Sequence, residues 1–581
     1  MHWLLSNAGM KHALFHRAFI APLVLLLSCR QESSTPSQAA ITALSLKRGQ
    51  IITCGATDRK LGAVEFNTSC GVATQESFNL ALQLLHSFEY DEAEKAFATV
   101  INKNPACAMA YWGVAMANFH PLWTPPSELE LKKGVKAISI AQSIAKKSPR
   151  EAAYIAAIAA YYHDWERVDH RSRCIAFEKA MELVHSKYPT DSEATIFYAL
   201  ALTAAADPAD KQFINQRKAG RLLEALYPNE PNHPGIIHYI IHTYDYPELA
   251  VLALPAARRY AAVAPSSAHA LHMPSHIFTR LGLWEECINS NLTSVASAQC
   301  YAKEAGIKGH WDEELHGMDY LVYAYLQRGQ NGLAKQQLDY LKSIKEVSPL
   351  NFKVAYAFAA IPARYSLENK RWPEAASFPI DSTVVPWKDF PWQKAIIHFA
   401  RVLGSVHTGQ MAAATAELAQ LKGIHSLLVK QKDAYKAKQV EIQLRAAEAW
   451  IHLLAGRNIE ALALMNQAAD LEDQTEKHPV TPSEVIPARE LLGDMLLQLN
   501  QPKQALAAYS ASLRKHPNRF NGLYNAGLAA ERAGLPDSAA LYYQQLIMVA
   551  NAANSDRTEL KTIRQFLTAH KFNVAVASHE I

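Results

Sequence analysis

The chain has 581 residues, of which 49% are hydrophobic and 19% charged, and its formal net charge is only +4. This length exceeds one ordinary core, so several domains or one elongated repeat array are expected. The near balance of Lys+Arg (58) and Asp+Glu (54), with no basic run, argues against nucleic acid as a partner. Histidine is in excess, with 24 in the chain. Eleven of them fall between His163 and His316.

The N-terminus has the pattern of an export signal. Lys11 and Arg17 precede an apolar stretch over residues 18–27. A basic start, a short apolar core and small residues at the cleavage point are typical of a secretory signal peptide. Residues 26–29 read Leu-Leu-Ser-Cys and resemble the lipobox of bacterial lipoproteins, which implies lipidation at Cys29. A plain signal peptide with a neighbouring cysteine is the alternative.

The next segment, 30–75, is predicted to be a tether followed by an irregular piece. Residues 31–40 are rich in Ser, Thr and Gln, as flexible linkers are. Arg30 replaces the Asp that usually retains such lipoproteins at the inner membrane, so the resemblance implies the outer membrane, facing the periplasm. No later segment reaches the roughly 18 apolar residues of a spanning helix. Contact with the membrane is therefore expected through the N-terminal lipid alone.

Six of the seven cysteines follow Cys29, and an exported, even set permits disulfide bonds. Cys54, Cys70 and Cys107 lie near one another in the sequence, so one bridge among them is expected. The remaining pairings stay open at this stage. Their scattered spacing, without a Cys-x-x-Cys pair, argues against a zinc knuckle.

The chain repeats itself with a period of 34 residues. Gly493, Pro502, Ala505 and Tyr509 return at this offset as Gly527, Pro536, Ala539 and Tyr543. Each unit consists of two helical patterns joined by a short turn. A turn glycine followed five positions later by a small residue marks five such units, at Gly282, Gly329, Gly409, Gly456 and Gly534. Strand-like alternation is nearly absent, apart from the stretch around residues 51–66.

These spacings resemble the tetratricopeptide repeat (TPR), a 34-residue helical hairpin. The resemblance implies an all-α fold, a TPR-like α-solenoid whose hairpins form a right-handed superhelix with a concave groove. It is strong near the C-terminus, good over 76–120 and degenerate between. The expected order is a signal peptide with lipobox (1–29), a tether and irregular segment (30–75), a degenerate TPR-like helical array (76–480), a regular TPR pair (484–550), and a C-terminal helix and tail (551–581).

The TPR register places a set of histidines on the groove side of the first helices. Groove-facing positions of the family's first helix are 2, 5, 9, 12 and 13, a stripe that follows from the 3.6-residue period. The residues that the register brings there are His238, His242, His269, His272, His276, His316 and Asp319, with His86 and His120 as outer candidates. His233 stands in a predicted turn and is expected outside the cluster.

This set has the chemistry of a transition-metal site. His238 and His242 are four residues apart, and imidazoles at such helical spacing can bind one divalent ion. Imidazole-rich, carboxylate-poor sites suit Zn, Cu or Fe better than Mg or Ca. Acidic residues expected to complete or orient the ligand shell are Asp319, Glu313 and Glu314. Pro274 is expected to interrupt the helix that carries the other three histidines, moving two of them into a cap or loop.

Two functions follow from these patterns. The first is a lipid-anchored TPR scaffold of the cell envelope that binds a protein or peptide partner in its concave groove. The second is a His-rich transition-metal protein that stores or delivers the ion, uses it as an enzyme, or is braced by it. Separately hydrogen-bonded groove histidines are the alternative to any metal. The sequence contains no P-loop, GxSxG or HExxH motif, so catalysis is not the favoured expectation.

Overall fold

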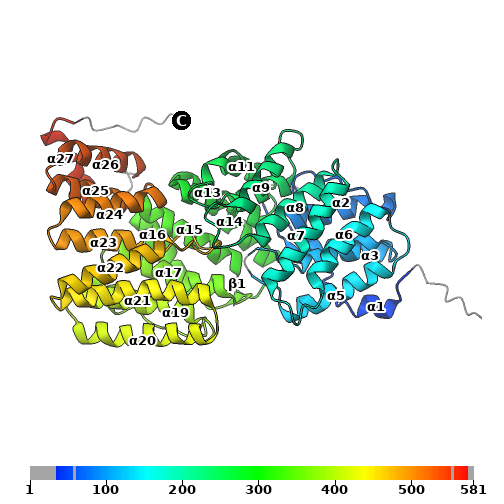
Figure 1. Ribbon diagram of the computed structural model, residues 1–581, viewed down its shortest axis with the longest axis horizontal. Helices are drawn as coiled ribbons and strands as arrows, with labels where there is room; N and C mark the ends of the chain where they lie inside the picture. Colours follow the sequence, from blue (N-terminus) through cyan, green and yellow to red (C-terminus); the bar gives the residue numbers. More distant parts are fainter. Residues whose placement is uncertain (1–34, 56–59, 123, 551–554, 573–581) are drawn as a thin grey trace, which may run out of the picture.

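The computed structural model describes residues 35–55, 60–122, 124–550 and 555–572. Within these residues the chain is an all-α solenoid, as predicted, in which successive helices pack against one another along an elongated body (Figure 1). The predicted signal peptide and Cys29 lie outside the described residues. No helix in the described part has the length and apolar character needed to cross a membrane.

Helices of the N-terminal half vary in length from 5 to 21 residues. Their bounds are α1 (Gln38–Thr42), α2 (Val72–His86), α3 (Tyr90–Lys103), α4 (Ala108–Ala117), α5 (Glu128–Ser143), α6 (Pro149–Tyr162), α7 (His170–Lys187), α8 (Ser192–Ala205), α9 (Ile214–Leu226), α10 (Pro234–Thr243), α11 (Ala250–Val263), α12 (Ala268–His272), α13 (Pro274–Leu281) and α14 (Trp284–Glu304).

The C-terminal half is more regular. Its helices are α15 (Asp312–Gln327), α16 (Asn331–Ser343), α17 (Phe352–Glu368), α18 (Trp372–Ala376), α19 (Pro391–His407), α20 (Met411–Lys430), α21 (Ala434–Leu454), α22 (Asn458–Asp473), α23 (Ala488–Gln498), α24 (Pro502–Lys515), α25 (Phe520–Arg532), α26 (Pro536–Val549) and α27 (Glu559–Ala569). Two short parallel strands, β1 (His310–Trp311) and β2 (Val347–Ser348), pair between the halves. The alternating stretch 51–66 forms no strand in its described residues, because no partner strand lies beside it.

The glycines that mark the repeat end helices in the left-handed conformation. Gly282, at the end of α13, has φ of 66°, and Gly534, at the end of α25, has φ of 74°. Glycine adopts this region without the steric cost that a Cβ imposes. The small residue five positions after each of the five turn glycines is fully buried: Cys287, Ala334, Ala414, Ala461 and Ala539.

Close helix packing explains the other repeat positions. A Cβ placed on Gly493 would lie 2.5 Å from the ring of Tyr509, and one on Gly527 would lie 2.3 Å from the ring of Tyr543. Both distances are far below van der Waals contact, so a small residue is required where the aromatic ring of the second helix crosses the first. The 34-residue spacing of these glycines therefore results from the close packing of the two helices in each hairpin.

The solenoid turns back on itself, so that its C-terminal repeats touch its middle. The Trp284 indole N–H donates to the Asn518 carbonyl (2.7 Å), and the Asn518 amide donates to the Gly282 carbonyl (3.2 Å). Next to them the fully buried Arg519 pairs with Glu368 (2.7 Å) and Glu490 (2.6 Å). The contacts of Asn518 and the pair of Arg519 with Glu368 join segments more than 150 residues apart in sequence.

The connection between α22 and α23, residues 474–487, packs inside the solenoid. The Lys477 ammonium lies 3.1 Å from Asp245, which follows α10. The Tyr320 hydroxyl donates to the Val480 carbonyl (3.2 Å), and the Arg364 guanidinium donates to the Ser483 carbonyl (2.7 Å). The chain thus fills part of its own concave side.

Two disulfides join the N-terminal piece to the helices. Cys70 pairs with Cys107, which confirms one bridge within the first three candidate cysteines. Cys54 instead pairs with Cys300 on α14, 246 residues away in sequence. That pairing brings the segment after the predicted tether to the middle of the solenoid, which spacing alone did not indicate.

Candidate functional site

Three groups of possible metal ligands occur within the described residues, each with ligand atoms within 4.8 Å of one another. Two of them contain all six histidines predicted from the register between 238 and 316. The groups are His238, His242 and His269; His272, His276 and His316; and His86, Glu193 and His233. We call the six residues of the first two groups the histidine cluster.

Four helices carry the histidine cluster. His238 and His242 lie one turn apart on α10, and His316 lies on α15. Pro274 divides the remaining helical stretch, since α12 ends at His272 and α13 begins at the proline. His269 and His272 nevertheless stay helical, on the short α12, so the prediction that they leave the helix was wrong.

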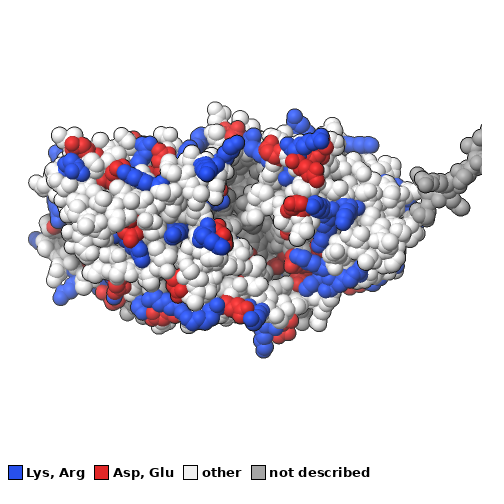
Figure 2. All heavy atoms as spheres, turned by 90° about the horizontal axis from the view of Figure 1, so that it is seen from below, with Lys and Arg blue, Asp and Glu red and all other residues white. Residues whose placement is uncertain are grey.

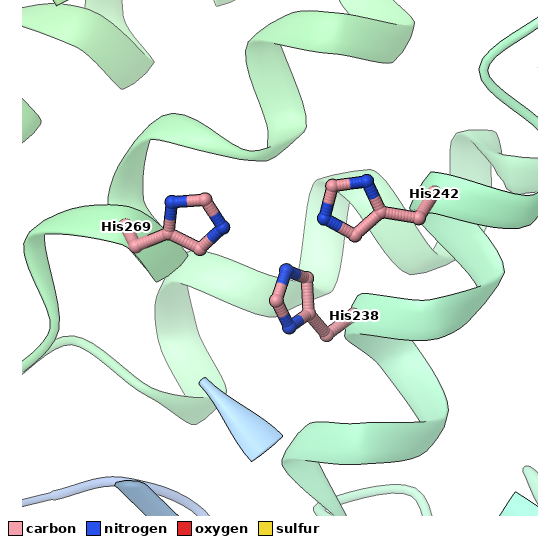
Figure 3. A group of neighbouring side chains, drawn as sticks. All are labelled: His238, His242 and His269. Atoms are coloured by element: carbon pink, nitrogen blue, oxygen red, sulfur yellow. The ribbon is translucent and has the colours of Figure 1, made fainter. Parts of the chain in front are cut away.

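The first group surrounds a common space. The ring centroid of His238 lies 4.7 Å from that of His242 and 5.1 Å from that of His269. Figure 3 shows one ring nitrogen of each residue pointing toward the space between the three rings. The His238 Nδ1–H donates to the His86 carbonyl (2.6 Å), which leaves a lone pair on Nε2. This Nε2 is buried and has no hydrogen-bond partner among the described residues.

The second group is held by two side-chain acceptors. The His272 Nδ1–H donates to the Asn291 carbonyl oxygen (2.6 Å), and the Asn291 amide is oriented by its own bond to the Cys287 carbonyl (2.8 Å). The His276 Nδ1–H donates to the Asp245 carboxylate (3.1 Å). The Nε2 atoms of His272 and His276 are then 3.1 Å apart.

Burial keeps the cluster neutral. It lowers the pKa of every histidine in the cluster below its usual range, that of His269 to about 3, and the neighbouring imidazoles act in the same direction. Asp245 stays ionised, since Lys477 and Arg280 beside it hold its pKa well below the usual value despite its burial. The imidazoles are thus in the protonation state that binds metal ions.

The carboxylates predicted as ligands lie elsewhere. Asp319 forms a buried ion pair with Arg364 on α17, and it belongs to neither histidine group. Glu313 pairs with Lys353, and Glu314 accepts from His310 (2.8 Å). Each of these acids is drawn to a cation or donor of another element, which the helical register could not foresee, so their assignment to the metal shell was wrong.

His86, one of the two outer candidates, lies in a separate group with His233 and Glu193. His86 and His233 both donate from Nε2 to Glu193 on α8, each at 3.0 Å. His86 Nδ1 accepts from the Tyr239 hydroxyl (3.0 Å), and His233 Nδ1 accepts from the Ile236 N–H at the start of α10 (3.4 Å). All four ring nitrogens are therefore used. Sequence reasoning missed Glu193, which stands outside any histidine pattern.

His120 belongs to none of the three groups. Its Nε2 lies 3.1 Å from Glu130, in a partly exposed ion pair. The cluster itself is on the inward side of the solenoid, as the register predicts, yet five of its six residues are buried and His242 is half-buried. Residues 474–487 and the N-terminal piece around Lys60, which bonds to Ser266 beside α12, cover that side. The histidines therefore do not line an open surface.

A separate pocket opens in the C-terminal half. Its cavity volume is about 30 Å³, and it is lined by α17, α19, α21 and α23, the first helices of successive hairpins, together with Glu472 on α22 and residues 484–486. Apolar and polar side chains both line it, among them Tyr356, Trp392 and the carboxylates of Glu472 and Glu484. The Gln443 side-chain oxygen at this pocket is buried and has no hydrogen-bond partner in the described structure.

The stacked hairpins with their glycine turns define a TPR-type solenoid protein. Residues 491–556 match the model of the tetratricopeptide repeat family, so the matching repeats lie near the C-terminus of this chain. No curated protein matches the chain. Repeats of this family are interaction scaffolds that present an extended concave surface.

Two solved structures resemble the helical array loosely. One is a human IFIT1 dimer with m7Gppp-AAAA, at 10% identity and a TM-score of 0.32, covering 81% of this chain and 95% of that chain. The other is the P58(IPK) TPR domain, at 14% identity and a TM-score of 0.20, covering 66% of this chain and 100% of that chain. Similarity at this level carries no argument about ligands or partners.

Proposed function

We propose that this protein is an exported, lipid-anchored scaffold of the cell envelope that binds a protein or peptide partner on its concave side. The observation that carries the proposal is the pocket lined by α17, α19, α21 and α23. Repeat scaffolds bind partners on surfaces shared by several repeats, and this pocket has contributions from four successive hairpins.

The chemistry of the pocket favours an extended peptide with an apolar anchor. Tyr356, Trp392 and Phe399 supply rigid apolar area, of the kind that dominates binding energy at interfaces. The unpartnered Gln443 oxygen supplies an acceptor for a backbone or side-chain N–H. Positive and negative side chains are interspersed on the face seen in Figure 2, which suits a partner that is not strongly charged.

Site-specific cross-linking tests the partner surface. A photoreactive residue at Gln443, in the pocket, is expected to form a discrete adduct with one envelope protein in living cells. The matched control is Ile459 on α22, whose side chain is 83% exposed on a second helix. An absent adduct at Gln443, or the same adduct at Ile459, contradicts binding on the concave side.

Export and anchoring have a separate test. The two disulfides support an oxidising compartment, where such bonds persist. The Cys29→Ser variant is expected to move from the membrane fraction to the soluble periplasmic fraction. The control is Cys174→Ser, which changes a buried free thiol and is expected to leave the protein at the membrane. Retention of the Cys29→Ser protein in the membrane fraction argues against lipidation.

A further inference from the structure

The second histidine group poses an electrostatic problem that a bound cation solves. Asn291 and Asp245 both accept, so His272 and His276 must each carry their proton on Nδ1. Both Nε2 atoms then present lone pairs to each other at 3.1 Å. Two acceptors at this distance repel one another unless a proton or a metal ion lies between them.

A proton is the less favourable solution. It would convert His276 into a buried imidazolium whose only carboxylate partner, Asp245, already neutralises Arg280 (2.8 Å) and Lys477 (3.1 Å). The imidazolium would be a third positive charge beside Asp245 in a water-poor interior, and a single N–H···N hydrogen bond is its only return. A divalent metal ion brings more charge to the same point, but its coordination bonds are far stronger, since zinc held by several protein ligands gains about 10–16 kcal/mol.

The first group supplies a second, independent observation. The buried His238 Nε2 has no hydrogen-bond partner in the described structure and faces the space shared with His242 and His269 (Figure 3). Burying an unsatisfied polar atom costs about 1–3 kcal/mol, so such atoms are rare unless they serve a ligand. The fixed Nδ1 bond of His238 to a carbonyl is the arrangement that orients metal-binding histidines.

We propose that the histidine cluster binds two transition-metal ions, one in each three-histidine group. The ring centroids of His242 and His276 are 6.2 Å apart, so the two sites are neighbours. No carboxylate enters either group, and imidazole-only sites select ions such as Zn, Cu or Fe over Mg or Ca.

The spacing of the ligand atoms fits ions of this class. Two nitrogens 3.1 Å apart subtend about 98° at an ion about 2.05 Å from each, close to tetrahedral or octahedral ligation. In the first group the nitrogens are within 4.8 Å, so each ring needs to move inward by at most about 0.7 Å to reach bonding distance. Rotation about side-chain torsions supplies such a shift.

Three protein ligands leave each ion an open coordination position, which is the property of metal sites that bind or transform a further molecule. Phe88 closes the first group on one side, with its ring centroid 4.4 Å from that of His238. Its φ of 57° puts it at the left-handed turn position after α2, which glycine occupies in other repeats. The Tyr320 hydroxyl lies 3.4 Å from both ring nitrogens of His276 and places a polar group beside the second site.

Metal content of the wild-type protein is the first test. Mature protein purified without chelators, and chelator-stripped protein reloaded with Zn²⁺ and then gel-filtered, are analysed for metals. We expect about two equivalents of transition metal per chain, and binding of two Zn²⁺ by the stripped protein. Less than about 0.2 equivalents after reloading overturns the proposal, and one equivalent overturns the assignment of two sites.

Paired variants locate the ions. His238→Gln and His276→Gln are each expected to lower retained Zn²⁺ from two equivalents to one, and the double variant to near zero. The controls are His163→Gln, at a side chain that is 80% exposed, and His86→Gln, in the group bonded to Glu193. Both controls are expected to retain two equivalents, and a loss of zinc in either equal to that in the cluster variants contradicts the location.

A spectroscopic measurement on the wild type keeps the test independent of variant folding. Electron paramagnetic resonance of the Cu²⁺-loaded protein is expected to show hyperfine coupling to several nitrogens, from imidazole ligands. Coupling to fewer than two nitrogens, as carboxylate or water coordination gives, overturns the histidine assignment even if every variant misfolds.

Discussion

Two buried groups of histidines lie next to each other in this protein and differ in how their nitrogens are used. In the group of His86, His233 and Glu193, every ring nitrogen has a hydrogen-bond partner and the carboxylate accepts from both rings. In the histidine cluster, backbone and side-chain acceptors take the Nδ1 protons of three rings. The Nε2 atoms of His272 and His276 then face each other, and that of His238 has no hydrogen-bond partner in the described structure. The first pattern stabilises the fold, and the second is the one that we propose binds metal ions.

The largest effect that separates the two groups is expected at Glu193. The Glu193→Ala change leaves two buried imidazoles without their acceptor, and breaking a buried pair of this kind costs about 3–5 kcal/mol. We expect the free energy of unfolding, from urea denaturation, to fall by this amount in zinc-free and in zinc-loaded protein alike. A loss that appears only in the presence of zinc would make this group a metal site too.

The next effect belongs to the histidine cluster. A ligand that binds only the folded chain stabilises it by RT ln(1 + L/Kd) per site, where L is its free concentration, so two sites together contribute about 2.8 kcal/mol at a concentration ten times the dissociation constant. Zinc at that excess is expected to raise the unfolding free energy of the wild type and of Glu193→Ala by this amount. The His238→Gln, His276→Gln double variant is expected to show no increase, and an undiminished increase would place the ion outside the cluster.

Much of the fold follows from the sequence because its constraints are local. The turn glycines and the close approach of Gly493 to Tyr509 impose a 34-residue period that is visible without coordinates. The six cluster histidines were found for the same reason, since helical register fixes the face of each residue. The register does not predict the partners of these histidines, because Glu193 and Asp245 reach them from other hairpins and Asn291 from the second helix of the hairpin.

The same limit explains the errors. Asp319 shares a face with His316, yet Arg364 on another helix pairs with it. A regular superhelix leaves its groove open, whereas residues 474–487 pack into this one through Lys477 and Val480. Contacts between segments more than 150 residues apart depend on the curvature of the whole array. The 34-residue period of the sequence does not specify that curvature.

The smallest expected effect, that of His238→Met, gives the sharpest comparison of the two groups when it is set beside His86→Met. His86→Met and His238→Met replace buried imidazoles by a flexible apolar side chain of similar size. His86→Met removes two hydrogen bonds and leaves Glu193 with one donor fewer, so we expect a loss of about 3 kcal/mol in zinc-free protein. His238→Met removes one bond but also a buried nitrogen that has no hydrogen-bond partner in the described structure, and these terms offset to within about 1 kcal/mol.

Urea denaturation of both variants in chelator measures this difference in unfolding free energy. The same measurement is then repeated with zinc, where the His238→Met variant is the more affected of the two. His238→Met is expected to lose the zinc-dependent stabilisation of the first site, whereas His86→Met keeps it in full. Equal losses for the two variants in chelator would mean that His238 is as well satisfied as His86. The His238 Nε2 atom would then give no support to a metal site, because a site that is maintained for a metal ion lowers the stability of the protein when the ion is absent.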